Sequence, residues 1–105
     1  MEIPIACALS ADEMPARLRE IAALGRTALV AVERDGPTAV LRFAHGDGVA
    51  RRLDAIAAAE SRCCAFLAFE RTDDGDGHVL RIAAPPDGAF MVDALVAAFQ
   101  GRLGA

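Results

Sequence analysis

The spacing of apolar residues along the chain alternates between a helical period and a strand period. Positions 2–9 have the apolar content of a strand. Ser10, with Glu13 three residues later, forms a capping box that predicts the start of a helix. Apolar residues then recur at helical spacing as Met14, Leu18, Ile21 and Leu24. Gly25 directly follows this run, so it is predicted to cap the carboxyl end of the helix.

Two pairs of apolar segments, each pair separated by a polar turn, predict two β-hairpins. Segments 28–34 and 38–44 flank an Asp-Gly-Pro turn. Segments 65–72 and 78–85 flank the turn sequence DDGDG. Such β-type runs, separated by a few turn-forming residues, are typical of antiparallel hairpins.

Two further helices complete the predicted pattern. The second helix starts at Val49, and residues on its apolar stripe follow a period of 3.6 as Leu53, Ile56, Glu60 and Cys63. The adjacent cysteines Cys63 and Cys64 are therefore expected on its last turn. The third helix follows the strand-breaking Pro85 and Pro86, and one of its faces carries Met91, Leu95, Phe99 and Leu103.

The element order β-α-β-β-α-β-β-α contains two helix-plus-hairpin units and predicts the fold class. An antiparallel sheet with helices that cover one face, an α+β two-layer sandwich, satisfies this order. A chain of 105 residues has the length of one domain with one core, so residues 1–105 are expected to form a single domain.

Charge and composition exclude several classes of partner. The formal net charge is -4, and the eleven basic residues include no basic run that would follow a phosphate backbone, so we expect no nucleic acid. No apolar segment approaches the roughly 20 residues of a membrane helix. The first residues lack the positive region of a signal peptide. Together with an odd number of cysteines, three, this predicts a cytoplasmic protein with reduced thiols.

The cysteines are the strongest candidates for chemistry. Adjacent side chains on a helix point about 100° apart, so two neighbouring thiols converge only where the helix ends. Cys7, at the end of the first predicted strand, is a candidate third thiolate beside Cys63 and Cys64. Sulfur ligands favour soft ions such as Cu(I), also bind Zn(II), and by the same argument favour Hg(II). Because Glu60 lies three and four residues before the cysteines, it is the expected non-sulfur group at this site.

Other interpretations of these residues remain open. A zinc ion would need a fourth ligand, for which Glu60, His45 and His78 are candidates. Free cysteines are also common as small buried residues, so the pair could belong to the core. Glu60 could instead pair with Arg62 or another arginine, because a buried carboxylate without a partner is costly.

Three segments together resemble a known family. The start IPIACALS, the central ESRCCAFLAF and the later LRIAAPPDG are similar to a family of small, largely uncharacterised bacterial proteins. Members of that family are often encoded beside MerR-type or ArsR-type metal-responsive regulators and mercury-resistance genes. The resemblance runs from Ile3 to about Leu95 and implies a thiol site connected with heavy metals. Where the family often has proline after the cysteine pair, this chain has Ala65.

Three classes of function follow. The first is a cytosolic thiolate binder of a soft metal, foremost Hg(II), with metal ligands among Cys7, Cys63, Cys64 and Glu60. The second is a thiol-dependent enzyme, either an organomercurial protonolysis enzyme with Glu60 as proton donor or a disulfide switch. The third is a non-catalytic accessory module whose cysteines are structural. Since three thiols per chain also permit an ion shared between two chains, a homodimer is an open prediction.

Overall fold

The computed structural model describes residues 14–63 and 66–101, which form three α-helices, four strands and one short 3₁₀ helix. The helices are α1 (Met14–Ala28), α2 (Val49–Cys63) and α3 (Ala89–Phe99), and η1 is Pro86–Gly88. The strands are β1 (Leu29–Asp35), β2 (Thr38–Ala44), β3 (Ala68–Asp74) and β4 (Gly77–Ala83). The predicted first strand, its Cys7 and the capping box lie outside the described residues.

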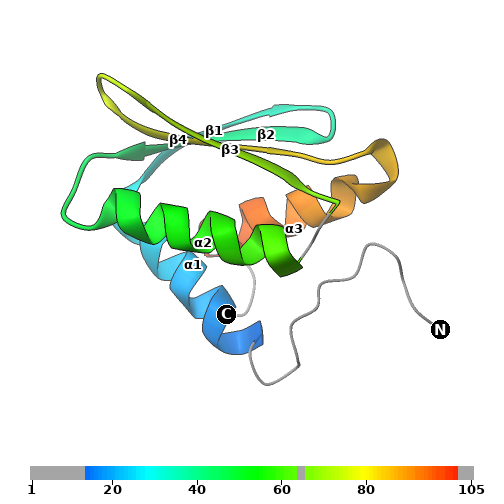
Figure 1. The fold of residues 1–105 in the computed structure, drawn as a ribbon, viewed down its shortest axis with the longest axis horizontal. Helices are drawn as coiled ribbons and strands as arrows, with labels where there is room; N and C mark the ends of the chain where they lie inside the picture. The colour runs from blue at the N-terminus through cyan, green and yellow to red at the C-terminus, as the bar shows by residue number, and fades with distance from the viewer. Residues whose placement is uncertain (1–13, 64–65, 102–105) are drawn as a thin grey trace.

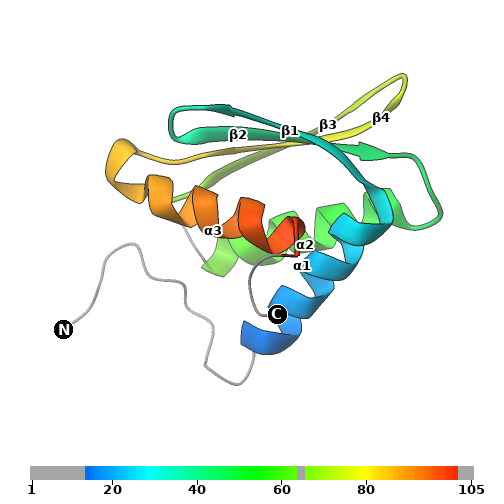
Figure 2. The same ribbon diagram turned by 180° about the vertical axis from the view of Figure 1, so that it is seen from behind.

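The strands form one antiparallel sheet in the order β1-β2-β4-β3. All three helices lie against one face of the sheet, and the opposite face has no helix on it (Figure 1). Figure 2 shows the same two layers from behind. The predicted α+β sandwich with helices on one face is therefore confirmed for the described part of the chain.

Residues on β2 alternate strictly between the two faces, as expected for a central strand with one covered face. Ala39, Leu41 and Phe43 are buried under the helices, while Thr38, Val40 and Arg42 lie on the open face. The rings of Phe43 and Phe99 meet edge to face at 5.5 Å between centroids, which joins the sheet to α3. The core therefore lies between the two layers.

The two hairpins share a short sequence motif in their second strands. Residues 40–44 read VLRFA in β2, and residues 79–83 read VLRIA in β4. The two segments occupy neighbouring central strands, and each leucine faces the helices while each arginine lies on the open face. The second strands of the two hairpins thus share a short sequence pattern as well as the same orientation of its leucine and arginine.

Gly25 does not cap a helix as the sequence predicted. It lies inside α1, which continues to Ala28. A β-carbon at Gly25 would lie 1.7 Å from the carbonyl oxygen of Phe99. The glycine is required because the backbones of α1 and α3 pass close together, a reason that no local pattern reveals.

Other predicted boundaries shift by a few residues. β3 starts at Ala68 instead of position 65, and the second hairpin extends to Asp74 and Gly77, which shortens the predicted turn. The apolar faces of α2 and α3 are as predicted, with Leu53, Ile56, Leu95 and Phe99 buried. Leu103 lies outside the described residues.

Candidate functional site

Glu60 is a charged residue on the buried stripe of α2. The stripe consists of Val49, Leu53, Ile56 and Glu60, and all four side chains are buried. Glu60 is 5% exposed. A carboxylate that is buried to this degree needs a partner.

Arg17 of α1 supplies that partner. Its guanidinium donates a hydrogen bond from Nη2 to Oε2 of Glu60 at 2.5 Å, and the two side chains are 18% and 7% exposed. Arg17 lies four residues before the buried Ile21 and seven before Leu24, so it shares their face of α1. This spacing is a sequence signal that marks Arg17 as an arginine on the buried face of α1. Arg62, the neighbour considered first, is exposed.

Two opposing effects act on the carboxyl group of Glu60. Burial raises its pKa above the ordinary value because the charged form loses hydration, and the positive charge of Arg17 lowers the pKa in opposition. Burial is the larger effect, so the net direction is upward. Glu60 consequently holds a proton more readily than an exposed glutamate.

The cysteines of the predicted site are described only in part. Cys63 is the last residue of α2, and its helical backbone lies one turn after Glu60. Residues at this spacing share one side of a helix. Cys7 and Cys64 lie outside the described residues. The structure thus places Glu60, Arg17 and the backbone of Cys63 at one end of the helical layer.

The two histidines lie at the other end of α2. His45 follows β2 directly, His78 is near the start of β4, and these positions neighbour the beginning of α2 at Val49. Since α2 has 15 residues, a helix of its length spans roughly 20 Å. Neither histidine therefore lies near enough to Cys63 to act as the fourth zinc ligand proposed from the sequence.

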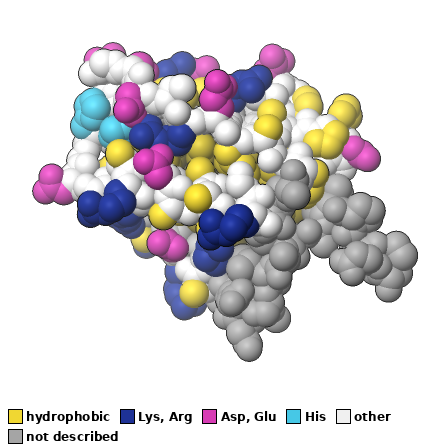
Figure 3. Space-filling model, in the orientation of Figure 1, with side chains coloured by type: hydrophobic (Ala, Val, Ile, Leu, Met, Phe, Trp, Pro, Cys, Tyr) yellow, Lys and Arg dark blue, Asp and Glu magenta, His cyan; other side chains and the backbone are white. Residues whose placement is uncertain are grey.

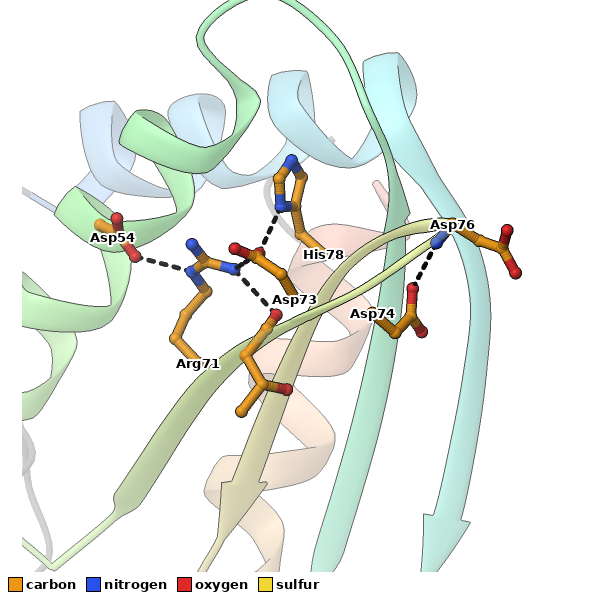
Figure 4. Close-up of polar contacts among 7 residues, drawn as sticks. Asp54, Arg71, Asp73, Asp74, Asp76 and His78 are labelled. Atoms are coloured by element: carbon orange, nitrogen blue, oxygen red, sulfur yellow. Dashed lines mark hydrogen bonds and ion pairs between the residues drawn. The ribbon is translucent and has the colours of Figure 1, made fainter.

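His78 belongs to a chain of charged contacts that connects β4, β3 and α2 (Figure 4). Its Nδ1 lies 2.6 Å from Oδ1 of Asp73, the residue opposite it on β3. The same carboxylate accepts from Nη1 of Arg71 at 2.6 Å, and Nε of Arg71 donates to Asp54 at 2.7 Å. Hydrogen bonds from His78 and then Arg71 lower the pKa of Asp73 to about 2.

In the acidic turn after β3, both carboxylate oxygens of Asp74 are engaged within the protein. One oxygen of Asp74 accepts the backbone N–H of Asp76, and the other accepts from Arg42 at 3.2 Å. A shallow hollow of about 200 Å³ lies beside this turn, lined by residues that include Arg42, Asp74 and His78. Across residues 14–63 and 66–101, no three histidine, cysteine, aspartate or glutamate side chains are arranged to hold a metal ion.

Comparison of the chain with known protein families, with characterised proteins and with solved structures finds no match. Among the described helices, none is both long and apolar enough to span a membrane.

Proposed function

We propose that this protein is a cytosolic thiolate binder of soft metal ions, Hg(II) foremost, that serves heavy-metal resistance. Cys63 and Cys64 are the primary ligands, and Cys7 is the third. The observation that carries the proposal is the end of α2 at Cys63, one turn after a buried Glu60–Arg17 pair. The family resemblance of the cysteine segments supports the same assignment.

The helix end matters because of side-chain direction. Within a helix, adjacent side chains diverge by about 100°, so two neighbouring thiols could not bind one ion. The proposal therefore requires the chain to leave the helical path at the cysteine pair, and the described part of α2 extends as far as Cys63. A soft ion bound by two or three sulfur atoms would then be held in preference to hard ions such as Mg(II).

The charges near Cys63 favour a role for Glu60 other than that of primary ligand. The carboxyl end of a helix carries partial negative charge, which disfavours thiolates there. Arg17 brings a positive charge to Glu60, which lies one turn before Cys63 and holds that charge in place. One oxygen of Glu60 is already engaged by Arg17, and a carboxylate is a hard ligand that Hg(II) does not prefer.

A second function, protonolysis of an organomercurial, is favoured by one observation. Burial raises the pKa of Glu60, so this carboxyl retains a transferable proton more readily than an exposed one. In such a reaction the carbon–mercury bond breaks, the proton of Glu60 passes to carbon, and Hg(II) remains on the thiolates. Glu60→Gln would leave Hg(II) binding nearly intact and abolish release of the hydrocarbon.

Native mass spectrometry of the reduced protein under anaerobic conditions tests the binding proposal. Hg(II), Cu(I) and Zn(II) are offered together against a small competing dithiol. We expect one ion retained per chain or per dimer, with the three thiols protected from alkylation. Cys64→Ser should abolish tight binding, and Cys7→Ser should weaken it. The control Glu70→Gln, a change at an exposed carboxylate of β3, should leave binding unchanged.

The contrary outcome is equally specific. Loss of every ion to the dithiol, together with thiols that resist alkylation until the protein unfolds, would make the cysteines core residues. The protein would then be an accessory module whose activity depends on a partner.

A further inference from the structure

The two histidines of the chain form a pair at the end of the molecule remote from Cys63. His45, exposed, follows β2, and His78, 8% exposed, lies on β4. Their ring centroids are 4.8 Å apart with the ring planes at 83°. Figure 3 shows the two side chains together at the surface of this end. The pairing arises from the sheet, because Phe43, two residues before His45, lies opposite His78.

Asp73 determines which nitrogen of His78 carries the proton. The carboxylate of Asp73 is paired with Arg71, whose Nη1 donates a hydrogen bond to its Oδ1 at 2.6 Å. A carboxylate can only accept a hydrogen bond, so Nδ1 of His78, 2.6 Å away, is the donor. The neutral imidazole then has its lone pair on Nε2, which points away from Asp73 (Figure 4).

This is the arrangement in which histidines bind metal ions. A metal-ligating histidine commonly donates its other ring N–H to a carboxylate, which fixes the tautomer and raises the basicity of the ligand. Asp73 is itself held by Arg71 at 2.6 Å, and Arg71 by Asp54 on α2. The orienting carboxylate is therefore fixed from two elements before any ion arrives.

The separation of the rings suits a shared ion. With metal–nitrogen bonds of about 2.0–2.1 Å and ligand angles of about 90–110°, two imidazole centroids lie about 4.5–5.3 Å apart. The observed 4.8 Å falls in that range. Because His45 is exposed, its ring is free to turn one nitrogen towards Nε2 of His78 without disturbing the core.

The surrounding charge also favours a cation. From Arg71 to His78 the chain carries three aspartates and one arginine. This arginine pairs with Asp54 and Asp73, and Arg42 of β2 pairs with Asp74. Imidazole nitrogens select Zn(II), Cu(II) and Ni(II) over Mg(II) and Ca(II), which prefer oxygen ligands.

We propose that His45 and His78 form a second metal site, specific for imidazole-preferring divalent ions such as Zn(II), in which Asp73 orients His78. Two protein nitrogens bind the ion, and water occupies its remaining positions. The site is open and exchangeable, and it is independent of the thiolate site proposed above, from which α2 separates it.

Long-range ¹H–¹⁵N NMR of the imidazole rings tests this proposal on the full reduced chain. These signals report each histidine separately, so metal bound at the thiols does not interfere. In the metal-free protein we expect His78 to carry its proton on Nδ1. Titration with Zn(II) should then move the Nε2 signal of His78 and one ring nitrogen of His45 along the same binding curve.

Variants distinguish a specific Zn(II) site from nonspecific electrostatic attraction of the ion to the acidic surface. His45→Ala, an exposed change that the fold tolerates, should weaken the Zn(II) response of His78 at least tenfold. Asp73→Asn should weaken it by about tenfold. Asp76→Asn removes the same charge from the neighbouring turn without touching His78, and it should change the affinity by less than about threefold.

Three results would overturn the proposal. A proton on Nε2 of His78 in the free protein would remove the ligand lone pair. Ring signals that do not respond to Zn(II), or that follow two different binding curves, would exclude a shared ion. Equal losses of Zn(II) affinity in Asp73→Asn and Asp76→Asn would show that Asp73 acts only through its negative charge and does not orient His78.

Discussion

The buried pair between Arg17 and Glu60 gives the sharpest prediction about stability. Removing one partner of a buried ion pair leaves the other charge without compensation, which typically costs about 3–5 kcal/mol. Arg17 is 18% exposed, so the low end applies. We expect Arg17→Leu to lower the free energy of unfolding by about 3 kcal/mol at pH 8. For a domain of this length that corresponds to a fall in Tm of about 15 °C.

Glu60→Gln should not carry this cost, because the Arg17 guanidinium that it leaves unpaired is 18% exposed and can be hydrated, whereas the Glu60 carboxylate is 7% exposed. A carboxyl whose pKa is raised by folding favours the protonated state in the folded protein. The stabilisation from protonated Glu60 is fully present below the ordinary pKa of 4.5. It is lost as the pH rises through the raised pKa of the folded state. Glutamine resembles the protonated form, so Glu60→Gln should be at least as stable as the parent at pH 8, with a smaller advantage at pH 5.

The assay is urea and thermal unfolding of the reduced protein at pH 5 and pH 8. Loss of stability in Arg17→Leu should be smaller at pH 5, because Glu60 can take up a proton there instead of remaining an isolated charge. Arg19→Leu is the matched control, since Arg19 is an exposed arginine of the same helix. It should change the unfolding free energy by less than about 0.5 kcal/mol.

Two outcomes would refute this reasoning. If Arg17→Leu lost no more stability than Arg19→Leu, the pair would not act as a buried ion pair. If Glu60→Gln were as destabilising as Arg17→Leu at pH 8, the charge of Glu60 would be net stabilising, and burial would not be the dominant effect on its pKa.

Two further predictions concern packing and acid stability. Gly25→Ala should lower the free energy of unfolding by about 1–3 kcal/mol in urea. The β-carbon of the new alanine would lie 1.7 Å from the carbonyl oxygen of Phe99. Gly75→Ala, where a β-carbon meets nothing within 4 Å, is the control; equal losses would contradict close contact between α1 and α3. Folding lowers the pKa of Asp73 from 3.8 to about 2, so its stabilising effect is present above pH 3.8 and is lost as the pH falls through about 2. In Asp73→Asn, stability should therefore fall less as the pH is lowered between these values. An unchanged fall would show that the contacts of Asp73 with His78 and Arg71 do not stabilise the folded state.

The prediction of the fold succeeded where the determining interactions are local. Alternating burial in β2 and the stripe from Val49 to Glu60 follow from the periods of strand and helix, and both are present in the sequence. The same periodicity correctly identified Glu60 as a carboxylate on a buried face. Such patterns are reliable because each residue's position relative to the core depends only on its own element.

Contacts between distant segments were decided by the tertiary structure alone. Gly25 has the sequence context of a helix cap, yet its role depends on the backbone of Phe99, 74 positions later in the chain. The sequence contains eleven arginines that could pair with Glu60. Arg17 is the partner because α1 packs beside α2. The sheet register sets His78 against Asp73 and near His45. Periodicity specifies which face of an element is buried, but only packing determines which residues meet there.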